Sequence, residues 1–274
     1  MGDVLRLVRA PNLLLTAAGV LAGGWIALAA VATPTGLVLA AVAAAGYAAA
    51  GYVLNDIWDA PADRVNRPPA ERPLAAGRVA RGTADLCVVI GVLVGFAASA
   101  LVSGAAVAVG LGALAVMLAY SPVLKRRGWL GNLAVALLGG LPLLYGALAV
   151  GRPAAGVVPG TLAAWLHLVR EIVKDLEDEA GDRALGRRTL PITLGPRPAA
   201  LIAAGLAAGF VPLSLLLPAL AHYRLAYFLI AVIAQLAVLS IASRLLVGRT
   251  ARNTVVLKGA MVVGLLALVA GRVA

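Results

Sequence analysis

Long apolar runs separated by short polar segments dominate the chain. A helix that crosses a membrane needs about 20 consecutive apolar residues, and nine runs of this kind can be recognised. Their limits are 12–32, 36–57, 84–103, 105–121, 132–150, 157–174, 197–218, 223–246 and 254–272. Only Ser103-Gly104 separates the third run from the fourth. The pattern predicts an all-α, polytopic membrane protein, in which a bundle of about nine transmembrane helices forms a single domain over residues 1–274.

The basic residues support this count and give it an orientation. If the N-terminus is cytoplasmic and successive runs alternate in direction, 20 of the 23 Lys and Arg residues lie on the cytoplasmic side. Only Arg152, Arg224 and Arg272 lie on the other side. Cytoplasmic loops carry an excess of basic residues, and a wrong number of spans would mix the two sides. We therefore expect nine spans, a cytoplasmic N-terminus and a multi-pass location in the cell membrane.

The composition agrees with a protein surrounded by lipid. Hydrophobic residues make up 62% of the chain and charged residues only 13%, whereas soluble domains carry about 25% charged residues. These values exclude a water-soluble globule and a disordered chain. The net charge of +11 follows from the orientation bias. We expect membrane lipids around the protein and no nucleic-acid partner, because no soluble basic domain is present to bind one.

The acidic residues are concentrated in two places. Of the 12 acidic residues, three lie between residues 56 and 63 and six between residues 171 and 182. Both segments contain the pattern D-x-x-D-x-x-x-D, formed by Asp56, Asp59 and Asp63 and again by Asp175, Asp178 and Asp182, with a constant offset of 119 residues. Steps of three and four place such carboxylates on one face of a helix. The spacing indicates a duplicated element, or two similar halves that face a common cavity.

Two rows of carboxylates at one membrane boundary favour a particular chemistry. Mg²⁺ prefers oxygen ligands and is commonly held by one or two carboxylates together with substrate phosphates. Basic side chains surround the two rows and could take the remaining phosphate oxygens; they are Arg67, Arg72, Lys125, Arg126, Arg127 and Lys174. A cavity that faces lipid suggests a diphosphate with a long hydrocarbon tail. A single row of carboxylates could instead be a helix end exposed to water. Two rows of identical spacing make that interpretation less favoured.

The same residues resemble a known family. The sequence N-D-x-x-D-x-x-x-D with a downstream R-P lies within Asn55–Pro73, a Y-S-P-x-L-K loop within Tyr120–Arg126, and the second acidic pattern within Arg170–Pro191. Together with the opening Arg9-Ala10-Pro11-Asn12, which is similar to an N-terminal R-x-x-N, this combination resembles the UbiA superfamily of intramembrane prenyltransferases. The resemblance covers most of the chain. It implies a nine-helix bundle, dependence on Mg²⁺ and an allylic prenyl diphosphate as donor.

The resemblance also implies roles for individual residues. The metal ligands would be Asn55, Asp56, Asp59, Asp63, Asp175, Asp178 and Asp182. The diphosphate would be bound by Asn55, Arg67, Arg72, Lys125 and Lys174. The residues expected to act in catalysis are Asp59, Asp63, Asp178, Asp182, Tyr120 and Lys125, with the ring of Tyr120 near the allylic cation. Tyr120 has a second interpretation as an interfacial aromatic residue, and Pro61 weakens the helical-face argument for Asp63.

The acceptor is less defined by the sequence. The stretch from Arg170 to Ile192 is similar to the digeranylgeranylglyceryl phosphate synthase branch of the superfamily, whose acceptor is the hydroxyl of geranylgeranylglyceryl phosphate. Arg187 and Arg188 could hold the phosphate of such an acceptor, or they could be ordinary cytoplasmic-loop charges. Branches that prenylate hydroxybenzoate, dihydroxynaphthoate or a porphyrinoid share the metal motifs. A lipid acceptor and an aromatic acceptor therefore both remain open.

Other classes of membrane protein fit the pattern less well. Acidic rings line the paths of cation channels and transporters, but here the acids lie at one membrane face. A CDP-alcohol phosphotransferase would need a D-G-x-x-A-R element, and none follows Asp56 or Asp175. His167 lies one turn before Arg170 and Glu171, where it could belong to the site or form a hydrogen bond between helices. An enzyme that transfers prenyl groups remains the favoured interpretation.

Overall fold

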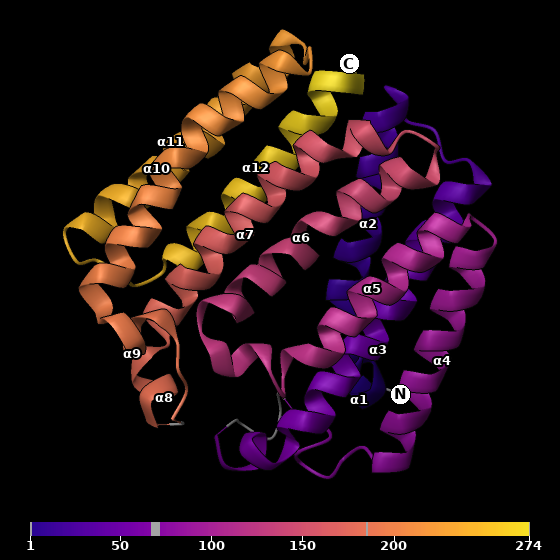
Figure 1. The fold of residues 1–274 in the computed structure, drawn as a ribbon, viewed down its shortest axis with the longest axis vertical. Helices are drawn as coiled ribbons and strands as arrows, with labels where there is room; N and C mark the ends of the chain where they lie inside the picture. The colour runs from indigo at the N-terminus through magenta and orange to yellow at the C-terminus, as the bar shows by residue number, and fades with distance from the viewer. Residues whose placement is uncertain (1, 67–71, 185, 274) are drawn as a thin grey trace.

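The computed structural model describes residues 2–66, 72–184 and 186–273, and the regular secondary structure in this part of the chain is helical. Nine long helices of the described residues coincide with the nine predicted runs (Figure 1). They are α2 (Ala10–Leu28), α3 (Thr35–Asn66), α4 (Arg81–Ala100), α5 (Gly104–Tyr120), α6 (Trp129–Ala149), α7 (Val157–Glu177), α10 (Pro196–Leu220), α11 (Leu225–Leu246) and α12 (Asn253–Val273). The predicted all-α class is confirmed.

Most of these helices meet the requirements for crossing a bilayer. Within the described residues, seven are long and apolar enough by length and hydropathy, and α5 is a shorter apolar helix. The protein is therefore a multi-pass membrane protein. The number of helices that cross the bilayer and the side on which the N-terminus lies stay predictions.

Short helices and caps mark the ends of the long ones. The short elements are α1 (Gly2–Leu7), η1 (Leu124–Arg127), η2 (Pro153–Gly156), α8 (Glu179–Ala184) and α9 (Leu190–Leu194). The weak break between the third and fourth runs is a real helix boundary, because the Ser103 side chain accepts a hydrogen bond from the Ala106 N–H at the start of α5. This is the expected action of an N-cap serine. In Figure 1, α8 and the C-terminal end of α3 lie at the same, lower end of the bundle.

Small residues let several helices touch backbone to backbone. A Cβ added at Gly146 of α6 would lie 1.8 Å from the carbonyl oxygen of Val20, and one at Gly23 of α2 would lie 2.1 Å from that of Leu143. A Cβ added at Gly91 of α4 would lie 2.8 Å from the carbonyl oxygen of Gly46 in α3. Close approach of this kind is how helices pack in membranes, where lipid offers no hydrophobic driving force.

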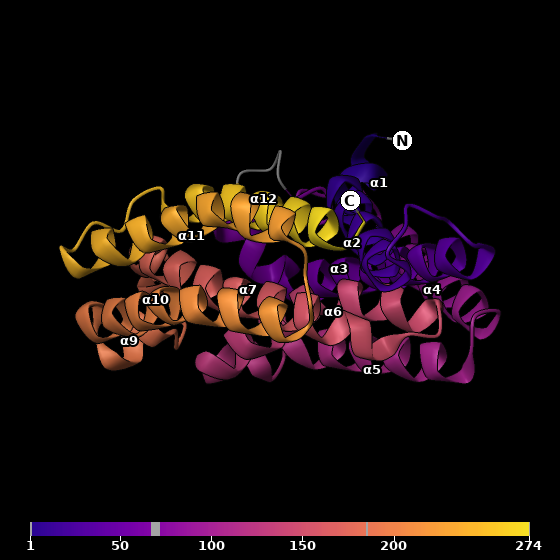
Figure 2. The same cartoon turned by 90° about the horizontal axis from the view of Figure 1, so that it is seen from above.

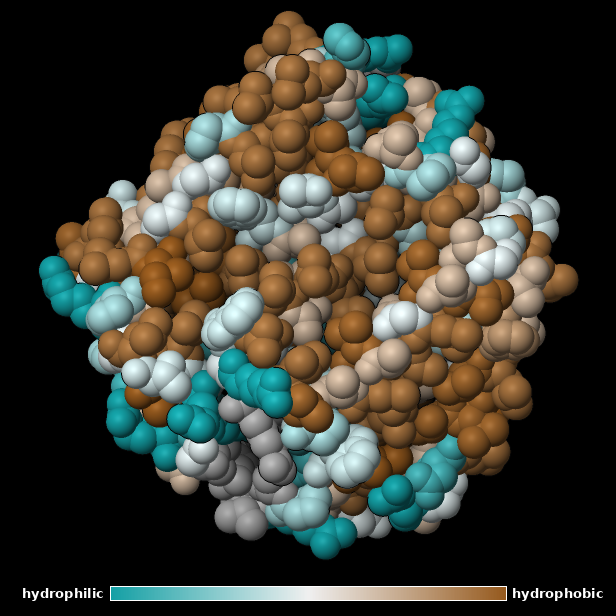
Figure 3. Space-filling view, in the orientation of Figure 1, coloured by the Kyte–Doolittle hydropathy of each residue, from teal (hydrophilic) through white to brown (hydrophobic). Residues whose placement is uncertain are grey.

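The buried apolar residues form separate clusters rather than one central core. The largest cluster joins α7, α10, α11 and α12, and a second joins α2 and α3 to their neighbours. Figure 2 shows α11 and α12 as a layer over α7 and α10. Between the clusters lies a cavity of about 1020 Å³. The face seen in Figure 3 is largely apolar, with hydrophilic side chains gathered along the lower margin and at the upper right, as lipid contact between two polar boundaries requires.

Candidate active site

The two acidic motifs line one cavity. From α3, the side chains of Asn55, Asp59 and Asp63 line it. From the end of α7 and from α8, the lining includes Asp175, Asp178 and Asp182. The fold thus brings together two segments separated by 119 residues in the sequence, because both motifs lie at the ends of helices that reach the same end of the bundle (Figure 1).

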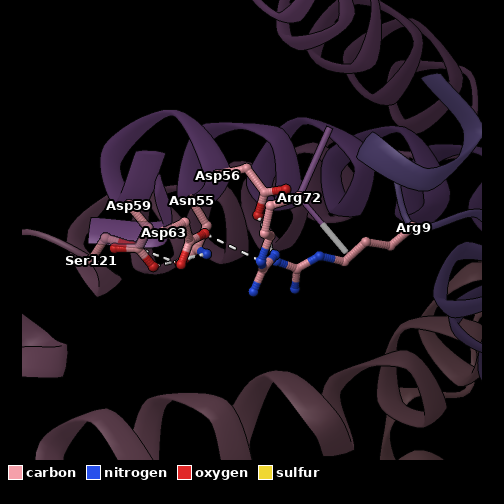
Figure 4. A network of polar contacts seen from close by, with 7 residues as sticks. All are labelled: Arg9, Asn55, Asp56, Asp59, Asp63, Arg72 and Ser121. Atoms are coloured by element: carbon pink, nitrogen blue, oxygen red, sulfur yellow. Dashed lines mark hydrogen bonds and ion pairs between the residues drawn. The ribbon is translucent and has the colours of Figure 1, made fainter. Parts of the chain in front are cut away.

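The first motif is held by a chain of polar contacts on α3. Asn55 donates a hydrogen bond from Nδ2 to Oδ2 of Asp59 at 3.3 Å, and its Oδ1 accepts one from the Ser121 hydroxyl at 2.6 Å. Arg72 lies with its Nε 3.2 Å from Oδ2 of Asp63. Helix α3 continues through Pro61 to Asn66, so Asp63 remains on the cavity side. Figure 4 shows these residues beside one another.

Asp56 takes a different position from the other carboxylates of its motif. It is 4% exposed, and it is not one of the residues that line the cavity. Its Oδ1 accepts hydrogen bonds from Nη2 of Arg9 and from Nη1 of Arg72, each at 2.7 Å. Figure 4 shows Asp56 turned toward these two guanidinium groups. In this structure Asp56 orients arginines, and the expectation that the whole row shares one cavity face does not hold for it.

The second motif does not lie on one continuous helix. Helix α7 ends at Glu177, Asp178 occupies the cap position, and α8 begins at Glu179. Asp178 donates its backbone N–H to the carbonyl of Lys174 at 2.9 Å. The chain therefore turns at the middle carboxylate, and the single helical face expected from the spacing is wrong for this motif. The turn still leaves all three carboxylates on the cavity.

Polar partners hold the outer carboxylates of the second motif. Asn132 of α6 donates from Nδ2 to Oδ2 of Asp175 at 2.9 Å, and Arg187 donates from Nη1 to Oδ1 of Asp182 at 2.6 Å. Asp175 lies just beyond the apolar run that ends at residue 174. Burial raises the pKa of its carboxyl to about 6, and the hydrogen bond from Asn132 acts in the opposite direction. A cation close to the Asp175 carboxyl would therefore favour its charged form.

Several other predicted residues also reach the cavity. Arg72, Lys174 and Tyr120 are part of its lining. Arg67 and the side chain of Lys125 lie outside the described residues. Arg187 lines the cavity, whereas Arg188 does not. The Arg187 guanidinium is engaged by Asp182, and of these two arginines only Arg187 lines the cavity.

Sequence reasoning missed three residues of the polar network. Arg9 appeared only as part of the N-terminal R-x-x-N, yet it reaches Asp56 and lies over the ring of Tyr52, 5.2 Å from its centroid. Ser121 is part of the Y-S-P loop, but nothing in the sequence offered a separate reason to place it in the site, where it donates a hydrogen bond to Asn55. Asn132 had one available signal, since it is a polar residue at the start of an otherwise apolar run. A buried amide near a membrane boundary is costly without a partner, and Asp175 is that partner.

Away from the polar end, the cavity becomes apolar. Its lining there includes Val109, Met117, Leu138, Leu162, Phe210 and Leu265. His167 also lines it, one turn of α7 deeper than Glu171. Such a space suits a hydrocarbon chain whose charged end lies among the carboxylates and arginines. The arrangement therefore suits an amphiphilic substrate with an anionic head.

The donor atoms at the polar end fit Mg²⁺. The groups contributed by both motifs are carboxylate and amide oxygens, which are the ligands that Mg²⁺ prefers. Within the described residues, no three Asp, Glu, His or Cys side chains gather closely enough to enclose an ion by themselves. Mg²⁺ commonly binds between one or two carboxylates and the phosphates of a substrate, so a complete protein cage is not required.

The fold and the cavity define a class of protein: a helical, multi-pass membrane protein with an acidic, amphiphile-sized site. A comparison with known families makes this more specific. The profile described as the UbiA prenyltransferase family matches residues 16–268. The chain belongs to this family and is a prenyltransferase, which confirms the resemblance found in its motifs.

Individual relatives support the assignment. Digeranylgeranylglyceryl phosphate synthase of Halobacterium salinarum is 39% identical over 203 residues, which cover 73% of this chain and 72% of that protein. A structure solved for digeranylgeranylglyceryl phosphate synthase in membranes superposes with a TM-score of 0.85 at 26% identity, covering 98% of this chain and 97% of that one. A UbiA homologue from Archaeoglobus fulgidus bound to GPP and Mg²⁺ has the same fold, with a TM-score of 0.71 at 17% identity and coverage of 98% and 97%.

Proposed function

We propose that the protein transfers a geranylgeranyl group from its diphosphate to the hydroxyl of geranylgeranylglyceryl phosphate, in a reaction that depends on Mg²⁺. The observation that carries this proposal is the meeting of two acidic motifs and their arginines at the polar end of a cavity that continues into an apolar interior. The names of the relatives support the choice of substrates, since they are similar to this chain over about 70% of its length.

The diphosphate is assigned to the polar end. Asn55, Asp59 and Asp63 on one side, and Asp175, Asp178 and Asp182 on the other, would hold Mg²⁺ together with diphosphate oxygens. When bound, Mg²⁺ supplies positive charge that stabilises the departing diphosphate. Arg72 and Lys174 line the same region and add hydrogen bonds to the phosphate oxygens, which are stronger when both groups are charged.

The transfer step forms one bond and breaks one bond. The bond between the allylic carbon and the diphosphate oxygen breaks, and both electrons leave with the diphosphate. An oxygen lone pair of the acceptor hydroxyl then forms the new ether bond to that carbon, and the hydroxyl proton passes to the released diphosphate. The ring of Tyr120 lines the cavity and would face the allylic cation, since a ring face attracts positive charge. The apolar lining keeps water from the cation.

The polar end is assigned to the cytoplasmic side of the cell membrane. This assignment rests on the distribution of the basic residues, of which 20 of 23 lie on one side of the predicted spans. Both acidic motifs then lie where α3 and α7 leave the membrane on that side. Soluble diphosphate could leave the site there directly, without crossing the bilayer.

Product analysis by mass spectrometry tests the proposal. Purified protein is reconstituted with labelled geranylgeranyl diphosphate and Mg²⁺, and is offered either geranylgeranylglyceryl phosphate or 4-hydroxybenzoate. We expect labelled digeranylgeranylglyceryl phosphate from the first acceptor and no prenylated product from the second. Prenylation of 4-hydroxybenzoate alone would assign the chain to an aromatic acceptor. Solute flux through proteoliposomes without any product would favour a transporter.

A further inference from the structure

A second group of basic side chains lines the cavity from α7 and α12. It consists of Arg170 and Lys174 of α7 and Lys258 of α12. We call these three residues the second basic group. They are not part of either acidic motif, and Lys258 belongs to no motif that the sequence analysis singled out. Two separate sets of cations on one cavity suggest two anionic groups bound at the same time.

The packing of α12 against α7 brings the two lysines to a similar depth. Glu177 at the end of α7 accepts hydrogen bonds from the backbone N–H of Thr254 at 2.9 Å and from its hydroxyl at 2.7 Å. Lys174 lies three residues before Glu177, and Lys258 lies four residues after Thr254. Because the helices run in opposite directions from this contact, each lysine lies about one turn, roughly 5 Å, inward from it.

The three cations of the second basic group differ in their acidic partners. Arg170 donates a hydrogen bond to Oε1 of Glu171, and the Lys174 ammonium is 3.9 Å from the same carboxylate. Lys258 forms no ion pair with any residue that the structure describes. Glu171 and Asp175 thus interact with Arg170 and Lys174, whereas Lys258 has no acidic partner among the described residues. An ammonium without an acidic partner beside an apolar space favours an anion there.

The position of Lys258 on α12 argues against a lysine that only reaches toward the lipid headgroups. Such lysines are common near the ends of transmembrane helices. Here, however, Met261, Val262, Leu265 and Leu268 line the cavity along with Lys258, and their spacing of three and four residues defines one face of the helix. Lys258, which is an exposed residue, therefore lies at the polar end of a continuous apolar strip that faces the cavity.

We propose that Lys258, which lies near the diphosphate-binding Lys174, binds the phosphate monoester of the lipid acceptor, and that the apolar face of α12 accommodates its hydrocarbon chain. This inference rests on the proposed function and adds to it the residues that select a phosphorylated, chain-bearing acceptor over an aromatic one. Lysine is a common phosphate ligand that acts as a point charge. The prenyl diphosphate lies between the acidic motifs, and the acceptor hydroxyl lies between the two anionic groups.

Steady-state kinetics of Lys258→Met test this assignment. A lost hydrogen bond to a charged group corresponds to about a tenfold or greater change in affinity. We expect the KM for geranylgeranylglyceryl phosphate to rise by about tenfold or more, while the KM for geranylgeranyl diphosphate stays unchanged. With geranylgeranylglycerol, which lacks the phosphate, the variant and the wild type should react equally. Lys258→Arg, which keeps the charge, should restore most of the affinity.

A matched control is available in the connection that precedes α12. Arg249→Met removes one positive charge from the same end of the molecule, at an exposed residue that does not line the cavity, and should leave both KM values unchanged. The assays are run in phosphatidylcholine vesicles with and without an anionic lipid. An effect of Lys258→Met that appears only with anionic lipid would assign the lysine to the membrane surface and overturn the proposal.

The outcomes separate this proposal from the proposed function. If the wild type makes no product from geranylgeranylglyceryl phosphate, the proposed function fails. If the wild type makes it but Lys258→Met raises the KM for the donor, or affects both acceptors equally, the phosphate assignment fails. Equilibrium binding of the acceptor without donor measures the effect should the Lys258 variant be poorly folded.

Discussion

Replacing Asp56 by Asn distinguishes a metal ligand from a residue that orients arginines. Asp56 belongs to the acidic pattern by its spacing, but in the structure its Oδ1 accepts hydrogen bonds from Arg9 and Arg72 at 2.7 Å. The substitution keeps the size of the side chain and removes its charge. We expect it to weaken the binding of the prenyl diphosphate, because Arg72 loses one of the two carboxylates that fix its position.

The magnitude follows from the bonds that are changed. A hydrogen bond to a charged group contributes about 1.5–3 kcal/mol. The side chains of Arg9 and Arg72 are 28% and 22% exposed, so solvent screens these contacts only in part. The asparagine oxygen can still accept a hydrogen bond, and we therefore expect the loss of about one charge-assisted contact. If this free energy is lost from binding of the prenyl diphosphate, its KM rises by roughly tenfold to a hundredfold.

The assay measures the donor and the metal separately. Initial rates are recorded while geranylgeranyl diphosphate is varied at saturating Mg²⁺, and again while Mg²⁺ is varied at saturating donor. For Asp56→Asn we expect a higher donor KM and an unchanged half-saturating Mg²⁺ concentration. For Asp59→Asn, whose side chain lines the cavity, we expect a marked increase in the Mg²⁺ requirement. Our reasoning is refuted if Asp56→Asn raises the Mg²⁺ requirement as much as Asp59→Asn and leaves the donor KM alone.

Two further predictions concern the second motif and the helix packing. Asn132→Leu removes the hydrogen bond that favours the charged form of Asp175, whose pKa burial already raises to about 6. The carboxylate then protonates at a higher pH, so the acidic limb of the rate profile at subsaturating Mg²⁺ should shift upward, and an unchanged or lower limb would contradict this. Gly146→Ala places a Cβ 1.8 Å from the Val20 carbonyl oxygen and should destabilise the bundle by about 1–3 kcal/mol, seen as a lower melting temperature in detergent. The exposed Gly205 has nothing within 4 Å of its Cβ position, and Gly205→Ala should leave the melting temperature equal or slightly higher.

The helical architecture could be predicted closely because lipid simplifies the physics. A membrane helix needs an apolar run of a fixed length, and helix ends follow from the polar segments between the runs. The nine predicted runs therefore coincide with nine long helices of the described residues, and even the weak break at Ser103 is a capped boundary. The main difference is α3, which extends to Asn66, beyond the apolar run that ends at residue 57.

The position of the site could be predicted, but the direction of each side chain could not. The spacing of Asp56, Asp59 and Asp63 places them on one broad helical face, yet so does the spacing of Asn55 with Asp59 and Asp63. Tertiary contacts decide between the two neighbours: Ser121 holds Asn55 at the cavity, and two arginines turn Asp56 away from it. These partners come from distant segments, so spacing along α3 contains no information about them.

The second motif shows the same limit for a different reason. The spacing of Asp175, Asp178 and Asp182 favours a single helix; no proline lies between them, and Gly181 comes only after the point at which α7 ends. In the structure α7 ends at Glu177, whose carboxylate is bound by Thr254 at the start of α12. The polar groups around this turn are satisfied by α12 and by Arg187, which the local sequence does not reveal.

The rate of prenyl transfer by Asp178→Ala, at saturating geranylgeranyl diphosphate and Mg²⁺, tests most directly whether the paired acidic motifs form the catalytic centre. Asp85→Ala provides the control, since Asp85 is an acidic residue outside the cavity that pairs with Arg81 on α4. We predict a loss of more than about a hundredfold for Asp178→Ala, an unchanged rate for Asp85→Ala and similar melting temperatures for both. A near-normal rate for a folded Asp178→Ala enzyme would contradict the account.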